Sequence, residues 1–225
     1  MENLTISAGE VRRFASAEVG TNMYAMLRDG KALIVDPHPS EELMQFLRGA
    51  GVKACTILLT HEHPDHTWGI HALQCQFETE LICQRLCAEA IATWENNRPA
   101  IVTAMLSIQD FRNGTNNAEL FQSRYETHLY VADTVFDGEY TMLWGKERFA
   151  FTHTPGHSRG SCCIQWNEKA IFTGDSLMWD EPVITRLPGG STKAFKAVTR
   201  PFLESLDKEI FVLPGHGRAF CLGEI

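Results

Sequence analysis

The sequence predicts an α/β fold, and three observations support this. The chain has 225 residues, a length that a single α/β domain commonly reaches. Its residues are 44% hydrophobic and 21% charged, which is typical of a globular protein and not of a disordered or coiled-coil chain. Segments with strand patterns also alternate with segments of helical pattern along the whole length. We therefore expect one domain over residues 1–225.

The N-terminal third carries strand patterns followed by one helix. Short apolar runs between turn signals predict strands at three places: residues 11–15, 22–27 and 32–35. Ser40 suits the N-terminal cap of a helix, because apolar side chains recur on one face over residues 43–50. Residues 55–59 form a continuous apolar run, which predicts a strand buried on both faces. This run ends just before His61.

The middle of the chain changes character. Three helical patterns follow one another, at residues 85–94, 99–111 and 118–128, and we interpret residues 85–128 as a helical insertion. If the insertion is a lid over a pocket, its apolar side would suit an acyl chain or an aromatic group. That side would consist of Trp94, Met105, Phe111, Phe121 and Tyr125. Packing of the same residues onto the sheets or onto a second subunit is the alternative.

The last third returns to strand patterns, at residues 148–152, 161–166, 170–173 and 210–213. Between the last two strands, Ser191 is the predicted cap of a helix that runs to Leu206. Pro201 should kink or restart this helix, since proline cannot donate the helical hydrogen bond.

Composition and charge argue against several classes of function. With 20 Lys and Arg against 28 Asp and Glu, the formal net charge is −8, which gives no general attraction to nucleic acid or anionic lipid. Seven cysteines form an odd count without the spacing of a disulfide framework, so we expect a cytoplasmic protein. No apolar stretch predicts a membrane helix or a signal peptide. The expected partner is a small-molecule substrate.

The strongest functional signal is the string from His61 to His66, which reads His-Glu-His-Pro-Asp-His. In an extended segment, residues two apart point to the same side, so His61 and His63 can face one metal ion. The following turn can bring Asp65 and His66 toward a second ion. Imidazole and carboxylate ligands suit Zn, Fe or Mn.

Three later segments share one design, in which a predicted strand ends in a glycine-containing loop with a possible metal ligand. These loops end in His157, Asp175 and His216. Open α/β folds place their sites at strand ends along one edge of the sheet. The three loops are therefore expected to complete the site that the histidine string begins.

The order of these motifs resembles the metallo-β-lactamase superfamily of αββα hydrolases, over about residues 11–218. The resemblance implies a four-layer αββα sandwich and a centre with two divalent metal ions, Zn in the first place and Fe or Mn as alternatives. It assigns His61, His63 and His157 to the first metal, Asp65, His66 and His216 to the second, and Asp175 as a bridge between them.

Asp65 is the candidate catalytic residue. Two divalent ions that share a hydroxide supply a nucleophile at neutral pH, and Asp65 can orient the water and accept its proton. Asp36, at the end of a predicted strand, would accept the second N–H of a ligating histidine, and His153 would also lie just outside the ligands. Trp68 and Trp179 follow two of the motifs and would wall the substrate pocket.

Within the superfamily, residues 154–158 and 172–177 are most similar to the glyoxalase II (hydroxyacylglutathione hydrolase) group and its single-domain relatives. This similarity implies hydrolysis of a thioester, a lactone or a related ester. Only nine residues follow His216, so we expect the glutathione-binding helical region of the full-length enzymes to be missing.

Two alternative functions share this site. A phosphodiesterase or nuclease would use the same metals and would need a basic groove, for which one helix offers Lys193, Lys196 and Arg200. A persulfide dioxygenase-like oxidoreductase would use a single iron. A homodimer is a further expectation, and the insertion at residues 85–128 would be either its interface or a lid.

Overall fold

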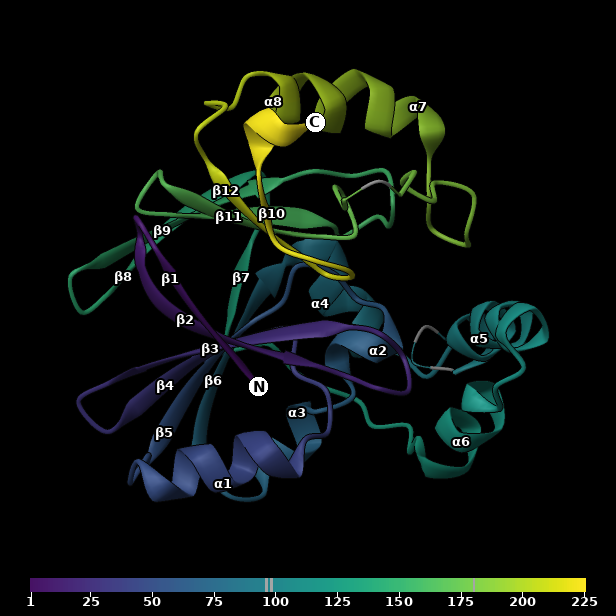
Figure 1. Ribbon diagram of the computed structural model, residues 1–225, viewed down its shortest axis with the longest axis horizontal. Helices are drawn as coiled ribbons and strands as arrows, with labels where there is room; N and C mark the ends of the chain where they lie inside the picture. The colour runs from purple at the N-terminus through teal and green to yellow at the C-terminus, as the bar shows by residue number, and fades with distance from the viewer. Residues whose placement is uncertain (96, 98, 180) are drawn as a thin grey trace.

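Two β-sheets lie face to face between outer layers of helices (Figure 1). The protein is described by a computed structural model, in which residues 1–95, 97, 99–179 and 181–225 are placed. Within these residues, one sheet has seven strands in the order β1 to β7, and the other has six in the order β13-β12-β11-β10-β9-β8. This arrangement is the four-layer αββα sandwich, so the predicted fold class is confirmed.

The first sheet comes from the N-terminal half of the chain. Its strands are β1 (Glu2–Ile6), β2 (Gly9–Ala15), β3 (Asn22–Arg28), β4 (Lys31–Val35), β5 (Ala54–Leu58), β6 (Glu78–Gln84) and β7 (Thr134–Phe136). Strands β1 to β4 pair antiparallel, and β4 to β7 pair parallel. Parallel neighbours need long crossovers. Here these are α1 (Glu41–Gly49), α2 (Pro64–Thr67), α3 (Ile70–Gln74), α4 (Arg85–Ile91), α5 (Ala100–Asn113) and α6 (Asn117–Arg124).

The second sheet comes from the C-terminal half. Its strands are β8 (Glu139–Trp144), β9 (Glu147–His153), β10 (Cys162–Trp166), β11 (Ala170–Gly174), β12 (Phe211–Pro214) and β13 (Phe220–Cys221). Only β11 and β12 pair parallel among these described strands. Between them run α7 (Thr192–Ala194), the π-helical turn η1 (Phe195–Thr199) and α8 (Arg200–Glu204), and the 3-10 turn η2 (Leu222–Glu224) follows β13.

Pro201 explains the irregular helix between β11 and β12. The Ser191 hydroxyl accepts a hydrogen bond from the Ala194 amide at 3.2 Å, which confirms the predicted cap. Pro201 has no amide hydrogen, so the α-helical bond to the carbonyl of Ala197 cannot form. The chain widens into the π-helical turn η1 before this proline, and α8 begins with Pro201 in its first turn. The predicted kink is therefore a π-helical turn.

Side chains of β4 alternate between two cores, which is why the molecule has four layers. Ala32 and Ile34 pack into the cluster that α1, α3 and α4 cover, whereas Leu33 and Val35 pack into the cluster between the two sheets. All four side chains are at most 1% exposed. A strand with apolar residues on both faces must be covered on both faces, by helices on one side and by the second sheet on the other.

The helical insertion divides into two parts. Helix α4 belongs to the outer layer of the sandwich, because Cys87 and Ile91 are buried in the same core as α1. Helices α5 and α6 lie beside the sandwich and form a small core of their own with Val19 (Figure 1). Among the described residues, no helix has the length and apolar character needed to cross a membrane.

Five strands end at one edge of the sandwich, where the two sheets meet. They are β4, β5, β9, β11 and β12, and each is followed within a few residues by a candidate site residue: Asp36, His61, His157, Asp175 and His216. Backbone hydrogen bonds join the sheets here, from Cys162 to Thr60 at 2.7 Å and from Asn22 to Gly215 at 2.6 Å. The fold thus brings segments far apart in sequence to one place.

Candidate metal centre

Three histidines direct their ring nitrogens toward one another. The Nε2 atom of His61 lies 3.1 Å from Nδ1 of His63, and Nε2 of His157 lies 2.9 Å from the same His63 atom. All three side chains are buried. Tetrahedral zinc with Zn–N bonds of about 2.0–2.1 Å separates its nitrogen ligands by roughly 3.3 Å. The three nitrogens therefore form a group that could hold one metal ion.

A second group consists of Asp65, His66 and His216. The Nε2 atom of His216 lies 3.4 Å from Oδ2 of Asp65, and Nε2 of His66 lies 3.6 Å from the same oxygen. The hydroxyl of Thr21 donates a hydrogen bond to this oxygen at 3.1 Å, which orients the carboxylate. Two imidazoles and one carboxylate are ligands that Zn, Fe and Mn all accept.

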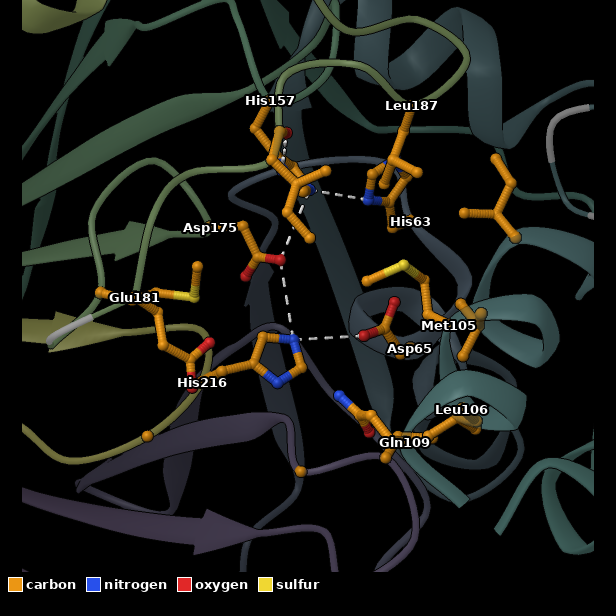
Figure 2. A pocket seen from close by; sticks show the side chains of 17 residues that line it. His63, Asp65, Met105, Leu106, Gln109, His157, Asp175, Glu181, Leu187 and His216 are labelled. Carbon is orange, nitrogen blue, oxygen red and sulfur yellow. Dashed lines mark hydrogen bonds and ion pairs between the residues drawn. The ribbon is translucent and has the colours of Figure 1, made fainter. Parts of the chain in front are cut away.

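Asp175 lies between the two groups (Figure 2). Its Oδ2 atom is 3.4 Å from Nε2 of His157 in the first group and 3.6 Å from Nε2 of His216 in the second. Its Oδ1 atom is 3.4 Å from Nε2 of His66. A carboxylate in this position could bridge two metal ions.

Two buried atoms at this centre, Nε2 of His66 and Oδ1 of Asp175, lie 3.4 Å apart but form no hydrogen bond with each other or with any other described residue. An unsatisfied buried polar atom costs about 1–3 kcal/mol, so native proteins contain few of them. Both atoms belong to side chains that bind metals, and a divalent cation would satisfy both. The residues of the centre therefore fit divalent metal ions.

Asp36 fixes the orientation of one histidine in each group. Its Oδ2 atom lies 3.1 Å from Nδ1 of His66 and accepts a hydrogen bond of 2.5 Å from the hydroxyl of Thr60. Because that hydroxyl donates its only hydrogen to Asp36, it accepts a hydrogen bond from Nδ1 of His61, 3.1 Å away. In both histidines Nδ1 is thus committed, and Nε2 is the atom available to a metal.

Burial and charge give the two groups different ionisation. Burial lowers the pKa of His63 to about 3 and holds the pKa of His61 well below its usual value. Burial also disfavours a charged His66, but the carboxylates of Asp65 and Asp175 outweigh it and hold the pKa of His66 well above its usual value. His61 and His63 are therefore neutral, as metal binding requires, whereas His66 carries a proton that a cation would displace.

Glycine is required next to two of the candidate ligands. Gly174, just before Asp175, has φ of +49°, and a Cβ atom there would overlap the side chain of Thr60. A Cβ atom on Gly215, just before His216, would overlap the carboxylate of Asp175 and the ring of His66. The glycine in each sequence motif therefore lets neighbouring loops approach closely enough to share one centre.

A cavity of about 300 Å³ opens onto both groups (Figure 2). Its polar wall carries candidate ligands from both groups: His63, Asp65, His157, Asp175 and His216. The rest of its described wall is mainly apolar and comes largely from α5 and from Met178, Ile184 and Leu187. Among the described residues that line it, none is Lys or Arg. A cavity of this size is at the lower end of the range for small-molecule sites.

Comparison with known proteins identifies the family. A sequence model of the metallo-β-lactamase superfamily matches residues 17–216. The chain belongs to this superfamily. Members of the superfamily bind divalent metals, and two of the relatives described next are named as a hydroxyacylglutathione hydrolase and an acyl-coenzyme A thioesterase. This protein is accordingly a metal-dependent hydrolase.

Individual relatives in the superfamily are distant. Hydroxyacylglutathione hydrolase GloC of Haemophilus influenzae is 28% identical over 198 residues, which cover 86% of this chain and 83% of that enzyme. Acyl-coenzyme A thioesterase MBLAC2 of Bos taurus is 29% identical over 172 residues, covering 74% of this chain and 58% of that enzyme. The crystal structure of the BLEG-1 B3 metallo-β-lactamase matches with a TM-score of 0.75 at 25% identity, covering 95% of each chain.

Glu62 has a structural role that the sequence analysis missed. It stands between two histidines of the superfamily motif, and its buried carboxylate accepts hydrogen bonds from the Ser158 hydroxyl at 2.8 Å and from the Gly160 amide at 3.4 Å. Burial raises the pKa of Glu62. The carboxylate ties the histidine string to the loop that carries His157. One signal in the sequence could have indicated this role. Side chains alternate along an extended segment, so Glu62 points away from the histidines on either side of it.

Asn22 and Tyr24 of β3 hold the loop that carries His216. The amide nitrogen of Asn22 donates to the carbonyls of Pro214 at 3.0 Å and of Gly217 at 2.8 Å. The hydroxyl of Tyr24 donates to the carbonyl of Pro214 at 2.8 Å. Their partners are backbone oxygens about 190 residues later, so the sequence carries no signal for these contacts.

The two tryptophans expected in the pocket wall lie elsewhere. Trp68 packs edge-on against Phe121, with 5.0 Å between ring centroids, and Trp179 packs against Phe220 at 5.4 Å. Neither is among the residues that line the cavity. His153 Nε2 lies 2.8 Å from the carbonyl of Arg159, so it closes the loop that carries His157 and makes no described bond to a candidate ligand.

The insertion contributes different pocket residues from those that its sequence suggested. Of the five apolar side chains named for its underside, Met105 is the one that lines the cavity within the described structure. Phe121 and Tyr125 pack into the small core of α5 and α6. Trp94 and Phe111 are 54% and 92% exposed. Helical patterning located the helices correctly but did not fix which face each one turns inward.

Proposed function

We propose that this protein hydrolyses a thioester, or a closely related ester or lactone, with two divalent metal ions at the centre. The observation that carries this proposal is a single cavity in which two adjacent groups of metal-ligating side chains face an apolar wall. Under this proposal His61, His63 and His157 hold one ion, Asp65, His66 and His216 hold the other, and Asp175 contacts both.

The reaction adds water to the acyl carbon and breaks its bond to sulfur or oxygen, giving a carboxylate and a thiol or alcohol. Bound divalent ions would supply a hydroxide at neutral pH and polarise the acyl carbonyl. Asp65 lines the cavity, and Thr21 holds its Oδ2 atom in place, so this carboxylate can orient the attacking water and take up its proton. Asp36 and Thr60 keep the Nδ1 atoms of His61 and His66 occupied.

A thioester is the preferred substrate among these esters. The Haemophilus influenzae and Bos taurus relatives are named for hydroxyacylglutathione and acyl-coenzyme A, which are both thioesters. Among the described residues, no Lys or Arg lines the cavity, so nothing there favours the phosphate of a nucleic acid or phosphodiester. Zinc is the metal we propose first, since three histidines form a common ligand set of catalytic zinc, with iron and manganese as the alternatives.

Metal analysis and a substrate panel test this proposal. The protein is purified without added metal, its metal content is measured, and it is assayed with S-lactoylglutathione, an acyl-homoserine lactone, bis(p-nitrophenyl) phosphate and nitrocefin. We expect two metal ions per chain and the highest kcat/KM for a thioester. One iron per chain with oxygen uptake would instead establish the oxidoreductase alternative, and a preference for the phosphodiester would establish a phosphodiesterase.

A further inference from the structure

Helix α5 forms one wall of the cavity. Ile101, Met105 and Gln109 all line it, and residues spaced by four lie one above another on the same face of a helix. The neighbouring row, Val102 and Leu106, also borders the cavity and packs into the small core that α5 shares with α6. The buried row anchors the helix, so the first row keeps its position beside the candidate metal centre (Figure 2).

The wall across the cavity is also apolar. It is formed by Met178, Ile184 and Leu187, from the segment that follows β11. Apart from the candidate ligand histidines, the ionisable side chains among the described lining residues are all acidic: Asp65, Asp175 and Glu181. An anionic group of a substrate would therefore find no cationic side chain between these two walls, whereas a hydrocarbon chain would be buried on both sides.

We infer that the space between α5 and the side chains of Met178, Ile184 and Leu187 is an acyl-chain site, which takes the uncharged hydrocarbon part of a thioester and leaves the charged part of the thiol outside the cavity. This inference rests on the proposed thioester hydrolysis and adds the class of acyl group. The acyl carbon lies at the candidate metal centre, and the chain extends along Ile101 and Met105. A short polar acyl group would leave the apolar walls uncovered.

Chain-length dependence tests the site. Thioesters of one small neutral thiol, N-acetylcysteamine, are prepared with saturated acyl groups from acetyl to decanoyl and assayed with the metal-loaded protein. Burial of each methylene contributes about 0.8 kcal/mol, so kcat/KM should rise roughly four-fold per methylene until the cavity is filled. We expect decanoyl to exceed acetyl by at least about ten-fold.

A matched pair of variants assigns this preference to α5. Met105→Trp fills the cavity and should lower the ratio of kcat/KM for decanoyl to that for acetyl by about ten-fold. Ile108→Trp introduces a tryptophan on the same helix, at a side chain that is 53% exposed and outside the cavity. It should leave the ratio unchanged. Leu187→Trp narrows the same space from the opposite wall and provides the same test if Met105→Trp does not fold.

Binding of decanoate, the hydrolysis product, gives a readout that does not depend on turnover. Calorimetric titration should show tighter binding of decanoate than of acetate, and Met105→Trp should weaken decanoate binding by about the same factor as it lowers the activity ratio. Thioester hydrolysis with no dependence on chain length would overturn the acyl-chain site and leave the proposed function standing. If decanoate binding depends on Met105 but the protein has no thioesterase activity, the acyl-chain site would stand and the proposed function would be overturned.

Discussion

Asp36 shows how one carboxylate can organise a site without touching the substrate. It follows β4 with φ of +51°, and it is 2% exposed. Through Thr60 it orients His61, and directly it orients His66. Because these histidines belong to different groups, a defect at this single residue should affect both metal sites.

We expect Asp36→Asn to weaken metal binding by about 10–100-fold, because an amide nitrogen cannot accept the hydrogen bonds that set the two histidines. Asparagine tolerates positive φ, so the backbone should be kept. Competition with a chromogenic chelator measures the affinity. The matched control is Asp29→Asn, in the exposed turn before β4, where φ is +49° and no candidate ligand lies nearby. Equal affinities for both variants would contradict this role of Asp36.

Asp65 is expected to act both as a ligand and as a base. Asp65→Ala should lower kcat by about 10²–10⁴-fold, the usual contribution of general acid–base catalysis, and should weaken one metal site. Steady-state kinetics at saturating metal, together with metal analysis, measure the two effects. Asp137→Ala, which removes an exposed ion pair with Arg85, is the control and should change neither. An Asp65→Ala protein that holds two metals and turns over at nearly the wild-type rate would rule out this assignment.

Glu62 should matter for stability more than for chemistry. Glu62→Ala leaves the buried Ser158 hydroxyl and the Gly160 amide without their carboxylate partner, so we expect a loss of about 1–3 kcal/mol in the free energy of unfolding. Urea denaturation measures this loss. Glu62→Gln keeps an acceptor oxygen for Ser158 and should lose less. If both variants unfold at the wild-type midpoint, the contact does not tie the two loops together.

At the scale of elements, the sequence predicts best those helices and strands whose signals lie within a few consecutive residues. The strands at 11–15, 22–27, 32–35 and 55–59 and the helix capped by Ser40 are confirmed, because periodicity and capping act within a few residues. Strand β7 has three residues, too few for a period to show. The sequence prediction does not include strand β8, along which Tyr140, Met142 and Trp144 alternate with more exposed residues.

The helix pair α5 and α6 has a capping arrangement that its sequence does not reveal. Asn116 is the N-cap residue of α6, but its side chain makes no capping bond. Asp110 of α5 accepts instead, from the amides of Asn117 at 2.9 Å and Ala118 at 2.8 Å. A carboxylate on one helix thereby caps the next and fixes the angle at which α5 borders the cavity.

We expect Asp110→Ala to speed amide hydrogen exchange at least several-fold at the start of α6, because two amides lose their acceptor. Asn116→Ala is the matched control, and it should leave exchange in α6 unchanged, although sequence rules alone would name Asn116 as the cap. Exchange followed by mass spectrometry resolves the two helices. The reverse ranking of the two variants would show that the N-cap residue, and not the preceding helix, holds α6.

At the scale of the whole molecule, the site depends on distances that no local pattern contains. His66 and His157 are 91 positions apart in sequence, yet both lie within 3.4 Å of the carboxylate of Asp175. The sequence motifs named the candidate ligands, and the resemblance to a superfamily supplied their arrangement. The contacts of Asn22 and Tyr24, and the true pocket wall, followed only from the packed structure.

Metal removal should therefore affect stability more than fold. The main cores are apolar and do not include the candidate ligands, so chelated protein should keep its far-UV circular dichroism. Its unfolding midpoint should fall, because the buried His66 and Asp175 atoms lose the cation that satisfies them. A site that binds only the folded state adds about 2.7 kcal/mol when free metal is 100 times Kd, so the midpoint should rise steadily as zinc is titrated back. The Asp36→Asn variant should need a higher zinc concentration for the same rise in the unfolding midpoint. A midpoint that does not move with zinc would show that the centre does not bind it, and loss of the dichroism on chelation would show that the cores need metal to form.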